Sequence, residues 1–85
     1  MRIIPADDYI TVNLYGGLEV YSPDEQRKGN KIKKSKVSSV KDVIQYYDIP
    51  REEVQVILID GQHADFKSEI SAGNTVSIFP LVGGG

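Results

Sequence analysis

The stretch Val54-Gln55-Val56-Ile57-Leu58-Ile59-Asp60-Gly61 decides the fold of this chain. Residues 54–59 form a nearly continuous apolar run rich in β-branched side chains, which is typical of a strand that is central or covered on much of both faces. Asp60-Gly61 is a strong hairpin signal, because both central residues of a type I′ turn need positive φ. The sequence therefore predicts a buried strand that returns through a short partner strand at about residues 62–66.

Two more strands are predicted from clear patterns on either side of this hairpin. Residues 9–15 alternate strictly, so that Ile10, Val12 and Leu14 point to one face of a sheet. Residues 75–80 form the last strand, which follows a glycine-containing turn and ends at a proline. Both segments are interpreted as strands of the same sheet.

The partner of the first strand is ambiguous in the sequence. Residues 18–21 are compatible with a short strand, whereas residues 31–37 alternate weakly. We favour residues 31–37 as the second main strand and interpret residues 16–30 as an expanded hairpin connection.

One helix is predicted at about residues 40–47. Its apolar positions recur at i, i+3, i+4 and i+7 and form one stripe: Val40, Val43, Ile44 and Tyr47. Ser38 or Ser39 can cap the start of this helix, and Pro50 ends it, because the residue before a proline avoids the helical region.

The order strand, strand, helix, strand, short strand, strand predicts an α+β domain of two layers. A mixed sheet of four or five strands with one main helix is the β-grasp (ubiquitin-like) arrangement. We expect the first two strands to form a hairpin, and the helix to cross over to a strand parallel to the first. The domain is expected over residues 1–82, with residues 83–85 as a flexible glycine tail.

The composition limits the kinds of site that the chain can hold. Its 85 residues leave little interior for both a stable core and an enzyme cleft, so we expect no enzyme active site. The absence of cysteine excludes disulfides, a catalytic thiol and thiolate metal sites. The single histidine, His63, argues against a histidine-based metal site, and we interpret it as a surface residue. We therefore expect no metal and no bound cofactor.

The chain has no apolar stretch long enough for a membrane span. Asp7 and Asp8 come too early for a signal peptide, so we expect a cytoplasmic protein with no membrane partner.

The net charge of −2 argues against bulk nucleic-acid binding, although the charges are unevenly spread. Six basic residues lie between positions 27 and 36: Arg27, Lys28, Lys31, Lys33, Lys34 and Lys36. Protection of an exposed edge strand is the commonest explanation of such lysines. A docking patch for an acidic partner and a nucleic-acid contact are the alternatives.

Three segments together resemble the MoaD/ThiS family of ubiquitin-like sulfur carriers. They are Val56-Ile57-Leu58-Ile59-Asp60-Gly61, Ala72-Gly73-Asn74-Thr75-Val76-Ser77-Ile78-Phe79-Pro80 and Gly83-Gly84-Gly85. This family includes the small subunit of molybdopterin synthase, the sulfur carrier of thiamine biosynthesis and archaeal ubiquitin-like modifiers. Asn74 stands where the family more often has aspartate, a minor change for a turn residue, and the tail has three glycines instead of two.

The resemblance implies a carrier whose C-terminal carboxylate, on Gly85 next to Gly84, is adenylated by a ubiquitin-activating-type (E1-like) adenylating enzyme. That enzyme uses ATP and magnesium, and a sulfur donor protein then converts the adenylate to a thiocarboxylate. The sulfur would serve molybdopterin, tungstopterin or thiamine-type cofactor biosynthesis, with a large synthase subunit as a further partner in the pterin case. A protein modifier conjugated through the same glycine and a non-catalytic interaction module are the alternatives.

The first glycine of the tail and three residues before it are predicted to contact the partner: Gly83, Val82, Leu81 and Phe79. If Val76 and Ile78 face the helix, alternation turns Phe79 to the outer face of the sheet, where an aromatic ring can anchor a partner. The alternative for Phe79 is a second small core under residues 16–30. Tyr9 and Tyr15, on the outward face of the first strand, are expected to belong to the same docking surface or to the same small core under residues 16–30.

Overall fold

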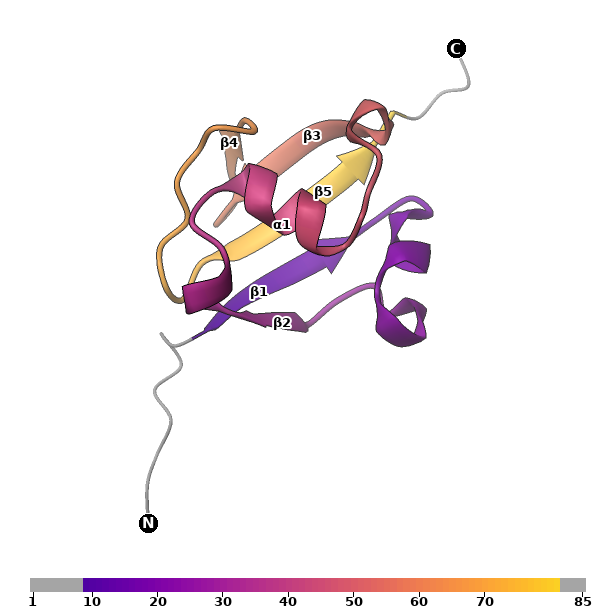
Figure 1. Ribbon diagram of the computed structural model, residues 1–85. Helices are drawn as coiled ribbons and strands as arrows, with labels where there is room; N and C mark the ends of the chain where they lie inside the picture. Colours follow the sequence, from indigo (N-terminus) through magenta and orange to yellow (C-terminus); the bar gives the residue numbers. More distant parts are fainter. Residues whose placement is uncertain (1–8, 82–85) are drawn as a thin grey trace.

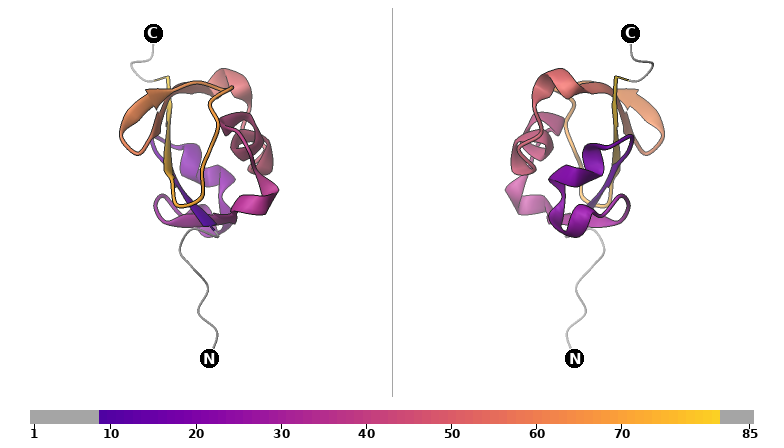
Figure 2. Two further views of the ribbon diagram at one scale, coloured as in Figure 1. Left: turned by 90° about the vertical axis from the view of Figure 1, so that its left-hand side faces the viewer. Right: turned by 90° about the vertical axis from the view of Figure 1, so that its right-hand side faces the viewer.

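The computed structural model describes residues 9–81 as one mixed sheet with a helix across one face (Figure 1). The strands are β1 (Tyr9–Leu14), β2 (Asn30–Lys33), β3 (Val54–Ile59), β4 (Gln62–Ala64) and β5 (Thr75–Pro80), and the helix is α1 (Val40–Tyr46). Side views show sheet and helix as two layers (Figure 2). The predicted β-grasp fold is therefore confirmed within the described residues.

The strand order is β2-β1-β5-β3-β4, with β1 and β5 as a central parallel pair. One expectation was wrong, because the strand after the helix is not parallel to β1. β3 is antiparallel to β5 and therefore also to β1. The β1–β2 hairpin reverses the chain and the crossover through α1 preserves the direction of β2, so β3 runs parallel to β2 instead. β3 lies between β5 and β4, so it is an interior strand of the sheet and not a neighbour of β1.

The core lies between α1 and the facing side of the two central strands. Ile10, Val12 and Leu14 of β1 and Val76 and Ile78 of β5 have no exposed surface, as the alternation predicts. The helix buries the apolar stripe that its period predicts: Val40, Val43, Ile44 and Tyr47. The helix ends at Tyr46, one residue earlier than expected, and Tyr47 is the capping residue that follows it.

The start of α1 is fixed by one carboxylate. Asp42 accepts hydrogen bonds from the backbone N–H of Ser38 at 2.8 Å, the Ser38 hydroxyl at 2.9 Å and the backbone N–H of Ser39 at 3.2 Å. The hydrogen bonds from Ser38 are the main reason why the pKa of Asp42 lies below its usual value. An ionised Asp42 is thus part of the N-terminal cap that the serines predict.

The second strand is shorter than predicted. β2 covers Asn30–Lys33, and residues 34–36 form a 3₁₀ turn instead of continuing the strand. The strand gains Asn30 because its buried amide donates to the carbonyls of Val12 at 3.2 Å and Gln26 at 2.9 Å. The strand therefore begins where a buried polar side chain is satisfied, which weak alternation did not reveal.

An expanded connection between β1 and β2 is present, as predicted, and it covers residues 15–29, since β2 already begins at Asn30. Within it, Leu18–Tyr21 and Pro23–Glu25 are 3₁₀ helices, so the strand reading of residues 18–21 is wrong. Leu18 enters the core, and the Tyr21 hydroxyl donates to the two carboxylate oxygens of Glu53 at 2.9 and 3.0 Å. These contacts hold the connection against the domain.

The β3–β4 hairpin has the predicted turn, with φ of 52° at Asp60 and 84° at Gly61. β4 ends at Ala64 and is shorter than the predicted return strand. The turn is also linked to the start of β5. The Asp60 carboxylate accepts from the backbone N–H of Thr75 at 2.9 Å and from the Asn74 side-chain amide at 2.6 Å.

Asn74→Asp should lower the free energy of unfolding by about 0.5–2 kcal/mol, because it removes the amide donor and places a second carboxylate against Asp60. We therefore expect the exchange of Asn and Asp at position 74 to change a contact between two turns. Urea unfolding at neutral pH measures the effect. The double variant Asp60→Asn with Asn74→Asp, which exchanges donor and acceptor, should recover part of the loss. A single variant as stable as the parent would show that this hydrogen bond contributes nothing.

Candidate functional site

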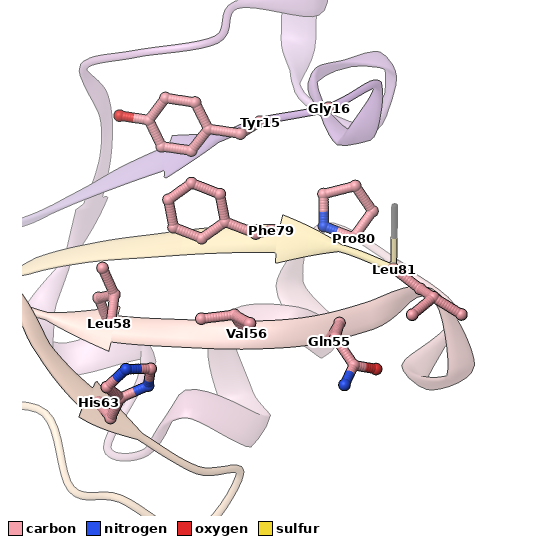
Figure 3. Close-up of a pocket in the computed structure, with 9 residues that line it drawn as sticks. All are labelled: Tyr15, Gly16, Gln55, Val56, Leu58, His63, Phe79, Pro80 and Leu81. Carbon is pink, nitrogen blue, oxygen red and sulfur yellow. The ribbon is translucent and has the colours of Figure 1, made fainter. Parts of the chain in front are cut away.

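The candidate site is an apolar groove of about 460 Å³ on the sheet face opposite α1, beside the end of β5 (Figure 3). Strands β3, β4 and β5 and the segment that follows each of the two central strands supply its lining: Tyr15, Gly16, Gln55, Val56, Leu58, His63, Phe79, Pro80 and Leu81. The groove gathers side chains from distant parts of the sequence at one end of the sheet.

Strand alternation places the groove residues. Because Val76 and Ile78 are buried against the helix layer, Phe79 points to the other face, as predicted. In β3, Ile57 is buried in the core, and its neighbours Val56 and Leu58 turn to the groove. The pairing of β3 with β5 sets Val56 directly opposite Phe79.

An aromatic stack forms one wall of the groove. The rings of Tyr15 and Phe79 are nearly parallel at 5°, with centroids 4.6 Å apart. The Lys28 ammonium lies 5.9 Å from the Tyr15 ring centroid, within the range of a cation–π contact. Phe79 is half-buried and lies outside the main core cluster.

The groove lies where the chain leaves β5. Leu81, the last described residue, lines the groove and exposes 67% of its surface. The predicted site residues Val82, Gly83, Gly84 and Gly85 lie outside the described residues. Of the predicted set, the structure therefore brings together Phe79 and Leu81.

Sequence reasoning predicts only Tyr15, Phe79 and Leu81 among the groove residues and misses the others: Gly16, Gln55, Val56, Leu58, His63 and Pro80. In the sequence, Val56 and Leu58 indicate only a buried strand, and His63 only a surface position. His63 is exposed, as expected, but its pairing with Leu58 across the β3–β4 hairpin brings it to the groove. Alternation along β3, combined with the register of a two-residue hairpin, could have predicted this neighbourhood. Tyr9 lies at the other end of β1 and does not line it.

The basic segment lies along an edge of the sheet, as the edge explanation expects. β2 is the outermost strand beside β1, with Lys31 and Lys33 exposed. Among residues 9–81, no group of three or more His, Cys, Asp or Glu side chains is placed to hold a metal ion. In the same range no helix is long and apolar enough to cross a membrane.

Comparisons with known proteins agree with this architecture. SAMP1 from Haloferax volcanii aligns with a TM-score of 0.66 and 16% identity, over 91% of this chain and 99% of that one. Urm1 from Trypanosoma brucei aligns with a TM-score of 0.62 and 16% identity, over 92% and 96%. The HVO 2177 protein of Haloferax volcanii aligns with a TM-score of 0.64 and 18% identity, over 91% and 86%. At these identities the structures show that the fold is shared.

Sequence comparison with curated proteins gives no match. The family model described as Mut7-C ubiquitin, in contrast, matches residues 7–83, which is nearly the whole chain. This match and the ubiquitin-like structures confirm the predicted resemblance to ubiquitin-like carriers and modifiers. The chain belongs to the Mut7-C ubiquitin family.

Proposed function

We propose that this protein is a sulfur carrier that presents the carboxylate of its C-terminal glycine to an adenylating enzyme. The observation that carries the proposal is the apolar groove beside Leu81, the point from which the chain continues to Gly83-Gly84-Gly85. A partner that docks on the groove is next to the segment that it must activate. The wall of the groove contains two stacked aromatic rings, and aromatic side chains are common anchors of protein interfaces.

The chemistry divides between the two proteins. A carboxylate is a poor acyl donor, so the enzyme would join Gly85 to AMP and release pyrophosphate from ATP. A sulfide equivalent from a sulfur donor protein then attacks the carbonyl carbon, AMP leaves, and a thiocarboxylate remains. The enzyme supplies ATP, magnesium and catalysis, while the carrier supplies a terminus without Cβ atoms that can enter a narrow channel. In this proposal the carrier is not an enzyme and holds no cofactor.

Transfer of the same activated glycine to a lysine amine would make the protein a modifier. The likeness to a structure described as small archaeal modifier protein 1 favours this second candidate. A third candidate is an interaction module that uses the groove and not the tail.

If the protein is a sulfur carrier, the enzyme that consumes the sulfur would belong to molybdopterin, tungstopterin or thiamine-type biosynthesis. In the pterin case a large synthase subunit would receive the tail.

Intact mass spectrometry tests the proposal with a chain that ends at Gly85. The protein is incubated with an adenylating enzyme of the ubiquitin-activating type, ATP, magnesium and sulfide. A mass gain equal to replacement of one oxygen by sulfur, absent when Gly83–Gly85 are deleted, supports a sulfur carrier. Covalent conjugates without that gain favour the modifier, and an unmodified chain with a competent enzyme favours the interaction module.

Phe79→Ala should raise the KM of the adenylating enzyme for this protein by about tenfold to a hundredfold, with little change in kcat. The reason is that it removes one ring of the stack that walls the groove without altering the tail. Phe66→Ala is the matched control, because Phe66 is half-buried near the helix and does not line the groove. Steady-state kinetics with both variants decides, and equal KM values would mean that the groove does not bind the enzyme.

A further inference from the structure

The free edge of β2 is a second surface with its own chemistry. β2 is the outermost strand beside β1, and its residues alternate between buried and exposed. Asn30 and Ile32 are buried, whereas Lys31 and Lys33 are exposed. The two lysines therefore lie on the sheet face that α1 does not cover, two positions apart.

The backbone groups of the same two lysines point away from the sheet. Thr11 donates its N–H to Asn74 at 2.9 Å and Tyr9 accepts from Gly73 at 2.9 Å, so both direct their backbone groups to the β5 side. Their neighbours in β1 therefore face β2 and pair with Ile32 and Asn30. The N–H and C=O groups of Lys31 and Lys33 consequently point to the free edge. Within residues 9–81, no other backbone segment forms hydrogen bonds with these outward groups.

The edge also concentrates positive charge. Residues 27–36 hold six of the ten Lys and Arg residues of the chain and none of its twelve Asp and Glu residues. The Lys31 ammonium donates to the Thr11 hydroxyl at 2.7 Å, which holds it along the outer face of the sheet. A second copy of β2 placed against this edge would set lysine against lysine, so self-pairing is disfavoured.

We propose that the free edge of β2 binds an extended acidic segment of a partner protein, which adds to the sheet as a further strand. Strand addition satisfies the four outward backbone groups of Lys31 and Lys33, and carboxylates opposite these lysines meet their ammonium groups. Their spacing sets an acidic, apolar, acidic pattern in the partner. The residue between the two carboxylates faces the helix side of the edge.

That side of the edge has room for a side chain. A hollow of about 230 Å³ lies between the first residues of β2 and the end of α1, lined in part by Asn30, Lys31, Tyr46 and Tyr47. Tyr46 exposes 47% of its surface there. Asp24 and Gln26 also line this hollow, so a side chain of the added strand would find aromatic surface there beside polar groups.

A peptide fits these observations better than a nucleic acid. Nucleic acid has no alternating N–H and C=O groups that could pair with those of Lys31 and Lys33. A long polyanion would also extend beyond the basic edge and would be repelled by the rest of this protein, whose net charge is −2. A short acidic strand would interact mainly with the lysines of the edge, because salt screens electrostatic interactions beyond about 10 Å at an ionic strength of about 0.1 M.

The experiment uses the full chain and a fluorescently labelled peptide, Thr-Glu-Val-Glu-Thr, with binding followed by anisotropy. The double variant Lys31→Glu with Lys33→Glu should weaken binding by about tenfold or more. The matched control is Lys41→Glu with Lys67→Glu, which changes the net charge equally at exposed sites away from the edge and should bind as the parent does. Deletion of Gly83–Gly85 should also leave binding unchanged, since this inference does not rest on the proposed sulfur-carrier function.

Two further measurements separate strand addition from attraction of charge alone. One peptide is N-methylated at the two glutamates, and a second peptide is N-methylated at the residues that flank them. The methyl groups block opposite edges of the added strand, so one of the two peptides should lose binding and the other should retain it. Hydrogen exchange at the backbone N–H of Lys31 and Lys33 should slow in the complex. Equal binding of the two methylated peptides, equal losses in the two double variants, or selective binding of a single-stranded oligothymidylate at this edge would overturn the proposal.

Discussion

Gly84→Ala should lose activation by the adenylating enzyme by about a hundredfold or more, while the stability of the domain stays unchanged. A methyl group next to the reacting residue would clash with a channel shaped for a chain without Cβ atoms, and it would displace the carboxylate from the adenylating groups. Pyrophosphate exchange and intact mass spectrometry measure activation, and thermal unfolding measures stability. The expected result is an intact fold with almost no adenylate and almost no thiocarboxylate.

Gly73→Ala is the matched control for this prediction. Gly73 lies in the turn before β5 with φ of 87°, and a Cβ atom there would meet nothing within 4 Å. Alanine at this position should cost about 1–2 kcal/mol of stability through its backbone conformation, and activation of the folded protein should persist. Gly84→Ala should thus lose activation and keep stability, whereas Gly73→Ala should lose stability and keep activation. A Gly84→Ala variant activated at the parent rate would refute the role proposed for the tail.

Ile78→Ala should lower the free energy of unfolding by about 2–5 kcal/mol. Ile78 has no exposed surface and lies on the central strand β5, where it pairs with Leu14 on one side and Ile57 on the other. Truncation leaves a cavity between the sheet and α1 that rigid neighbours cannot fill. For a domain of this size each kcal/mol corresponds to about 4–8 °C in Tm, so the Tm of the variant should fall by about 8 °C or more.

Urea unfolding with Ser77→Ala as the control tests this prediction. Ser77 precedes Ile78 on the same strand but points to the other face and is half-buried, so its replacement should change stability by about 0.5 kcal/mol or less. Together with Phe79→Ala, these variants assign three consecutive residues to different roles. If Ile78→Ala costs no more than Ser77→Ala, β5 does not carry the core in the way described.

Much of the fold could be predicted because its signals are local. Alternation in residues 9–15 and 75–80 predicts which side of each strand is buried, since successive side chains of a strand point to opposite faces. The i, i+3, i+4 stripe predicts the helix, and Asp60-Gly61 predicts the hairpin turn. These patterns depend on backbone geometry within a few residues, so one sequence is sufficient to reveal them.

Other features depend on contacts that residue patterns do not record. The start of β2 follows from the buried amide of Asn30, which donates to carbonyls on two different segments. The direction of β3 follows from the path of the whole crossover, and the importance of Asn74 follows from its contact with a turn 14 residues away. Each of these is a pairing between distant segments, for which local propensity carries no signal.

The candidate site divides along the same line. By itself the sequence determined the β-grasp order of elements, the outward direction of Phe79 and a glycine tail whose chemistry is inferred from a family resemblance. Only the tertiary structure decided that Tyr15, Val56, Leu58, His63 and Phe79 share one groove and that the lysines of β2 flank a free backbone edge. The physical reason is that grooves and edges are properties of the assembled sheet, which exist only after strand order and register bring distant side chains to one face.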